Sequence, residues 1–211
     1  MGTEEELTTK SLLFQWILFN VIIISTVAPV VVLMQLIYGT YGFDTSHQMT
    51  ANIILAAVLS FLFGFCQCQI LQPYFMNAKQ WMWASFSGLS IGLSLILLEN
   101  YFATNWKTSE VSIWLLSGVI IGTTLGVAQW LFLRQHVKFS GAWILANILG
   151  WSMGLEWGWS IWSANQTDNA SFIVIFFSSV FCFAITYSGI TGVLLALFLH
   201  FLTKNSQTPA A

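Results

Sequence analysis

A single carboxylate lies inside a long apolar segment of this sequence. Glu156 is flanked by Trp151, Trp157 and Trp159, and no other charged residue occurs between positions 141 and 162. An ionisable group at membrane depth is costly, which makes it a candidate functional residue. Because indole faces attract cations, these four residues are typical of a pocket for a cationic ligand. The alternative interpretation is a glutamate that reaches the membrane surface, or pairs with Lys107, amid a belt of interfacial tryptophans.

The composition indicates a polytopic membrane protein. Of the 211 residues, 57% are hydrophobic and only 7% are charged, whereas soluble domains carry about 25% charged residues. Uncharged runs of roughly 20 residues recur, which is the length needed to cross a bilayer. The sequence predicts an all-α bundle of six transmembrane helices over residues 11–202, between polar tails at 1–10 and 203–211. The expected helices cover about 11–43, 50–72, 80–98, 111–133, 141–162 and 171–202.

Two parts of the chain match each other at an offset of 62 positions. Residues 56–93 align with 118–155 without a gap, which predicts a duplicated helical hairpin with copies at 50–98 and 112–160. Gly192 and the LLALFLH after it resemble Gly126 and the following residues. The last helix and the first are therefore expected to form a third, degenerate hairpin that has lost the glutamine. The matched pairs include Gly64 with Gly126, Gln67 with Gln129, Leu71 with Leu133, Trp81 with Trp143, Ala84 with Ala146 and Gly88 with Gly150.

Small residues recur every four positions on the expected helices. This spacing forms a groove that allows a neighbouring helix to approach closely where lipid offers no hydrophobic driving force. Gln67 and Gln129 are expected to act as structural clasps, because a buried glutamine in a membrane hydrogen-bonds to an adjacent helix. The helix-packing residues expected from the small-residue pattern are Gly64, Gly88, Gly92, Gly118, Gly122, Gly126, Ala146, Gly150, Gly154 and Gly158.

Charged residues predict the orientation in the membrane and exclude several kinds of function. Lys107 alone is expected on one side, and both termini should be cytoplasmic because positive residues are retained there. The net charge of −2 and the absence of a basic stripe argue against a nucleic-acid partner. The sequence contains no metal-ligand spacing and no catalytic motif, so neither a metal site nor an enzyme is expected. The cations expected on the cytoplasmic side are Lys10, Lys79, Arg134, Lys138 and Lys204.

The segment GVAQWLFLRQHVKFSGAWILANILGW resembles a pattern in uncharacterised multispan membrane proteins of cyanobacteria and related bacteria. In that pattern a glycine, a Gln-Trp pair and a basic turn precede a second helix that ends in Gly-Trp. The resemblance implies a bacterial inner membrane or a thylakoid, and it implies no activity. The residues that carry it are Gly126, Gln129, Trp130, Arg134, Trp143, Gly150 and Trp151.

Two classes of function remain open. The first is a non-enzymatic accessory or assembly subunit of a larger membrane complex, and it is favoured because no polar constellation beyond Glu156 marks a substrate path. The second is a small-molecule binding or transport component with an exterior-side pocket around Glu156 and its tryptophans. The lipid bilayer is a partner in both cases, with other membrane subunits in the first and a small-molecule ligand in the second. The sequence does not identify a cofactor.

Overall fold

The computed structural model describes residues 11–26, 29–30, 33, 45–102, 110–137, 139–164 and 172–206. The regular structure of these residues is helical, so the prediction of an all-α fold is confirmed. The helix at the end of the chain extends four residues beyond the expected limit at 202. The helices are the N-terminal helix Ser11–Thr26, α2 (Thr45–Leu71), α3 (Ala78–Phe102), α4 (Glu110–Leu133), α5 (Ala142–Ala164) and α6 (Phe172–Ser206).

Four of these helices are long and apolar enough to cross a membrane, which supports the prediction of a membrane protein. The segments concerned are Thr50–Leu71, Ala78–Leu98, Ile113–Leu133 and Val174–Phe198. α5 is not among them, although it has 23 residues. Five tryptophans, together with Asn147 and Glu156, lower its mean hydropathy. The N-terminal helix Ser11–Thr26 is apolar but shorter.

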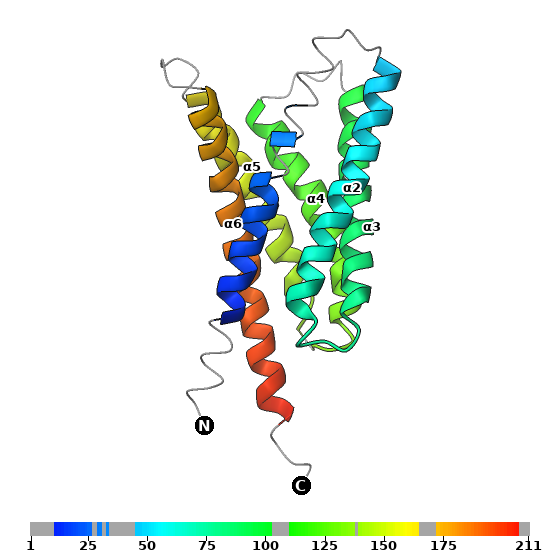
Figure 1. Cartoon of the computed structure of the whole chain (residues 1–211), viewed down its shortest axis with the longest axis vertical. Coiled ribbons are helices and arrows are strands. Elements are labelled where there is room, and N and C mark those ends of the chain that lie inside the picture. Colours follow the sequence, from blue (N-terminus) through cyan, green and yellow to red (C-terminus); the bar gives the residue numbers. More distant parts are fainter. Residues whose placement is uncertain are drawn as a thin grey trace.

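The helices follow one another around the bundle in chain order. α2 packs on α3, α3 on α4, α4 on α5 and α5 on α6. The N-terminal helix lies between α6 and α2, because Trp16 hydrogen-bonds to Thr191 of α6 and Asn20 hydrogen-bonds to Gln67 of α2. The α2–α3 and α4–α5 turns lie at the same end of the bundle as the start of the N-terminal helix and the end of α6 (Figure 1). We call this end the turn end.

Two clusters of buried side chains form the core. The cluster nearer the turn end is built around Trp16, Trp81 and Trp143, whose rings meet edge to face with centroids 5.4–6.2 Å apart. Aromatic pairs in this geometry contribute about 0.5–1.5 kcal/mol beyond the burial of their surface. The second cluster lies further from the turn end and includes Phe63 of α2 and Tyr187 of α6, with ring centroids 5.9 Å apart. The side chains of all six helices therefore meet along the axis of the bundle.

Glycines lie where neighbouring helices come closest. A Cβ at Gly122 would lie 2.5 Å from Ile148 Cα, so α4 and α5 are in backbone contact there. Such a contact permits no side chain larger than hydrogen unless the helices move apart. Along the other interfaces, Gly64 faces α3, Gly88 and Gly92 face α4, Gly118 and Gly126 face α5, and Gly150, Gly154 and Gly158 face α6. Ala146, also expected from the small-residue pattern, is buried on α5.

Candidate functional site

Indole and amide groups form a hydrogen-bonded network at the level of the three buried tryptophans. Trp81 Nε1 donates to Gln67 Oε1 at 3.0 Å, and Trp143 Nε1 donates to Gln129 Oε1 at 2.7 Å. Gln129 Nε2 donates to Gln67 Oε1 at 3.2 Å, which joins the two pairs across α2 and α4. Gln129 Nε2 also donates to Ser85 Oγ at 2.8 Å. Both glutamines have no exposed surface, so these bonds link four helices in a dry environment.

A third tryptophan makes the corresponding bond to a threonine. Trp16 Nε1 donates to Thr191 Oγ1 at 3.1 Å. Thr191 follows Gln129 by 62 positions, just as Gln129 follows Gln67. Aligning Gly192 with Gly126, as the sequence suggested, would instead place Leu195 opposite Gln129.

Asparagines connect this network to the neighbouring helices. Asn20 follows Trp16 by four residues, donates to the Trp16 carbonyl at 2.8 Å and accepts from Gln67 Nε2 at 3.0 Å. Asn147 follows Trp143 by four residues, donates to the Trp143 carbonyl at 3.0 Å and accepts from the Tyr187 hydroxyl at 3.5 Å. The amide oxygen and the amide nitrogen of Gln67 thus both have hydrogen-bond partners within the protein. These hydrogen bonds link side chains of neighbouring helices.

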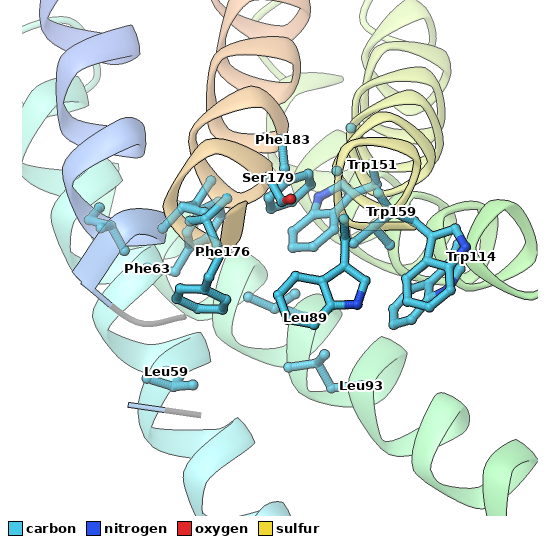
Figure 2. A pocket seen from close by; sticks show the side chains of 17 residues that line it. Leu59, Phe63, Leu89, Leu93, Trp114, Trp151, Trp159, Phe176, Ser179 and Phe183 are labelled. Carbon is cyan, nitrogen blue, oxygen red and sulfur yellow. The ribbon is translucent and has the colours of Figure 1, made fainter. Parts of the chain in front are cut away.

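A cavity of about 650 Å³ lies beyond the network, in the half of the bundle away from the turn end. Figure 2 shows the side chains that line it, with the rings of Trp151 and Phe183 beside the Ser179 hydroxyl. That hydroxyl donates to the Ile175 carbonyl at 2.9 Å. The described helices all contribute to the lining, which is apolar and aromatic apart from the Ser179 hydroxyl and the indole nitrogens. The lining residues are Ile23, Ile24, Leu59, Phe63, Leu89, Leu93, Trp114, Trp151, Gly154, Leu155, Gly158, Trp159, Trp162, Phe176, Ser179, Val180 and Phe183.

The four residues expected to form one pocket occupy different sides of α5. Trp151 and Trp159 line the cavity, and Trp159 stacks on Trp114 with ring centroids 5.1 Å apart. Neither Glu156 nor Trp157 is among the lining residues, and Trp157 is half exposed on the outer surface. The cavity is therefore an apolar site, with Glu156 outside its lining.

Glu156 lies on the side of α5 that faces α4. Ser152, four residues earlier and so on the same face, lies against the backbone at Gly118 of α4. Glu156 Oε2 and Ser152 Oγ are both buried and have no hydrogen-bond partner among the described residues. Lys107, the expected partner of the glutamate, lies outside the described residues. A buried carboxylate oxygen without a donor is costly, and the structure gives no physical account of how this cost is met.

Among the described residues, no group of three His, Cys, Asp or Glu side chains is close enough to hold a metal ion. Lys79 and Arg134 are exposed at the turn end, and the Arg134 guanidinium lies 5.3 Å from the centroid of the Trp130 ring. Tyr74 lies in the α2–α3 turn, where burial raises the pKa of its hydroxyl. Lys10 and Lys138 lie outside the described residues.

Comparison of the chain with protein-family models, with curated proteins and with solved structures found no match. The resemblance to multispan proteins of cyanobacteria therefore stays a prediction.

Proposed function

We propose that this protein binds an apolar small molecule within the membrane, in its central cavity. The proposal depends on one observation, a cavity of about 650 Å³ to which the described helices all contribute apolar and aromatic side chains. Ligand pockets typically have volumes of about 300–1,000 Å³ and are lined by hydrophobic and aromatic groups with few polar ones.

We also infer that the six helices cross the membrane as three hairpins. α5 has 23 residues and so measures about 34 Å, which exceeds the roughly 30 Å of a hydrocarbon core. It packs between α4 and α6, which each contain an apolar span. In each hairpin a tryptophan of one helix bonds to a polar residue of the other, and the three bonds are Trp81 to Gln67, Trp143 to Gln129, and Trp16 to Thr191.

The turn end is proposed to face the cytoplasm of a bacterium or the corresponding side of a thylakoid. Lys79 and Arg134 both lie at this end, and positive residues are retained in the cytoplasm. The cavity would then lie in the outer half of the membrane. This orientation places it on the side where the sequence predicted a pocket.

A role as an accessory subunit is the second candidate. Aromatic side chains gather on the outer surface of α2 and α3, where Phe61 lies 6.2–6.3 Å from the rings of Phe65, Trp83 and Phe86. Trp83 is 56% exposed. A patch of this kind contacts lipid in a single protein and would contact another helix in a membrane complex. It is where a partner helix would dock under the accessory role.

Native mass spectrometry of the protein, extracted gently from its own membrane, tests the proposed function. We expect wild type to retain a small apolar molecule. A variant with Leu59→Trp and Leu93→Trp should lose it, since both residues line the cavity and the larger rings would fill part of it. The matched control is Leu62→Trp, the same substitution on the outer face of α2, where the leucine is 43% exposed. The control should retain the molecule.

The alternative outcomes of this experiment are distinct. A polypeptide that co-purifies at fixed stoichiometry, with no small molecule, would support the accessory role. Retention of the molecule by the Leu59→Trp, Leu93→Trp variant at the wild-type level would contradict binding in the central cavity. An adduct with the mass of a bilayer phospholipid that is lost in the Leu59→Trp, Leu93→Trp variant and kept in the Leu62→Trp control would show that the cavity holds an acyl chain and not a separate ligand.

A further inference from the structure

Aromatic rings are concentrated on one part of the central cavity. α4, α5 and α6 contribute six of the seven rings in its lining, whereas the N-terminal helix, α2 and α3 contribute aliphatic side chains and the ring of Phe63. Two pairs of these rings are in contact, each with centroids 5.1 Å apart. Figure 2 shows Leu59 on the opposite side of the cavity from one of these pairs. We call the two pairs, Trp114 with Trp159 and Trp151 with Phe183, the aromatic wall.

The chain uses aliphatic residues at positions that correspond to part of this wall. Trp151 follows Leu89 by 62 positions, and both are buried in the same core cluster. Phe183 follows Ile121 by 62 positions and packs against that cluster, in which Ile121 is buried. A belt of tryptophans at the membrane surface does not account for Trp151, which is only 8% exposed. The rings of Trp151 and Phe183 are therefore a distinctive feature of the cavity.

A ligand within the membrane competes for an apolar cavity with the acyl chains of the surrounding lipid. Lipid chains are as apolar as aliphatic side chains, so burial against leucine or isoleucine gives a ligand no advantage over them. Contacts between aromatic rings are favourable beyond the burial of their surface. The lining is apolar apart from the Ser179 hydroxyl and the indole nitrogens. Ring contacts are therefore the main means by which this cavity can select a ligand over an acyl chain.

We propose that the ligand of the central cavity is a planar conjugated molecule whose π system contacts Trp151 and Phe183. This inference rests on the proposed function, because it requires that the cavity holds a ligand. Saturated parts of the ligand would lie against Leu59 and Leu93 on the other helices. An acyl chain is the poorer occupant, because it has no π system to pair with the aromatic wall.

The test compares pyrene with perhydropyrene, which has the same carbon skeleton without conjugation. The full-length protein, stripped of lipid, is passed through a gel-filtration column equilibrated with detergent that contains one hydrocarbon at a fixed mole fraction. The hydrocarbon that elutes with the protein, in excess of the micelle background, is measured by gas chromatography. Wild type should bind one pyrene with at least about four times the affinity for perhydropyrene, since each of two ring contacts contributes at least roughly a factor of two.

A variant with Trp151→Leu and Phe183→Ile tests the role of the rings. It introduces the residue types that the chain already has at Leu89 and Ile121. The preference for pyrene should fall to about twofold or less, while perhydropyrene still binds. The matched control is Trp157→Leu, the same kind of change on the outer surface of α5, where the indole is half exposed. The control should keep the wild-type preference.

The outcomes distinguish this inference from the proposed function. Equal affinity of wild type for the two hydrocarbons would overturn the inference and leave the binding of apolar molecules standing. Binding of neither hydrocarbon would overturn both. An unchanged preference for pyrene in the Trp151→Leu, Phe183→Ile variant would also overturn the inference, because the selecting contacts would then lie elsewhere. The comparison in wild type needs no substitution, so the inference remains testable even if that variant does not fold.

Discussion

Replacing Gln67 by leucine should destabilise the bundle more than any other substitution of a single polar side chain in the network. The amide oxygen of Gln67 accepts from Trp81, Ser85 and Gln129, and its nitrogen donates to Asn20. Hydrogen bonds between membrane helices contribute about 0.6 kcal/mol each on average, so four of them amount to about 2.4 kcal/mol. The Trp81 indole would also lose its acceptor in a dry core, which adds to the cost. We expect a total loss of about 2–4 kcal/mol.

The measurement is reversible unfolding in mixed micelles, followed by circular dichroism as the fraction of denaturing detergent is raised. Gln69→Leu is the matched control, because Gln69 lies on the same helix and is exposed. Its free energy of unfolding should stay within about 0.5 kcal/mol of wild type. Trp81→Phe, made in wild type and in Gln67→Leu, isolates the indole–amide pair, whose coupling should be about 0.6–1.7 kcal/mol. If Gln67→Leu and Gln69→Leu have the same free energy of unfolding, the network does not hold the helices together and the reasoning fails.

Two further substitutions test the interface and the carboxylate. Gly122→Ala places a Cβ 2.5 Å from Ile148 Cα and should cost about 1–3 kcal/mol in the same unfolding assay. Gly189→Ala, which meets no atom within 4 Å, should instead gain roughly 0.5–1 kcal/mol; equal effects of the two would contradict backbone contact between α4 and α5. Glu156→Gln should leave retention of the apolar ligand unchanged, since the glutamate does not line the cavity. Loss of the ligand in that variant would restore the cationic pocket predicted from the sequence.

The sequence predicted the helical class and most helix limits because each depends on local composition. Uncharged runs of about 20 residues define spans, and the expected helix over 80–98 ended just before Glu99 and Asn100. Helix α3 continues to Phe102, since polar side chains at a membrane surface do not end a helix. The expected helix ends therefore agree with the observed ends to within a few residues where a turn follows the helix, as at Leu71 and Leu133.

The central cavity could not be predicted, because the sequence does not show which side of each helix faces inward. Apolar residues occur on every side of these helices, so no amphipathic stripe distinguishes the side that faces the core from the side that faces lipid. Trp157 and Trp159 are two residues apart, yet one is half exposed and the other lines the cavity. Proximity in sequence had grouped them with Glu156 in a single pocket. Only the packing of α5 between α4 and α6 separates them.

Under the three-hairpin proposal there is a physical reason why the third copy of the repeat is hard to see in the sequence. Leu71, Leu133 and Leu195 are spaced by 62 positions and have no exposed surface. The 62-residue spacing of buried positions therefore continues into α6, although most residue types at that spacing differ there. Thr191 replaces the glutamine and still accepts a hydrogen bond from a tryptophan. That tryptophan, Trp16, precedes it by 175 residues, because the second helix of this hairpin is at the start of the chain. A comparison at one fixed offset finds two hairpins, whereas the proposed third hairpin joins the two ends of the chain through this contact.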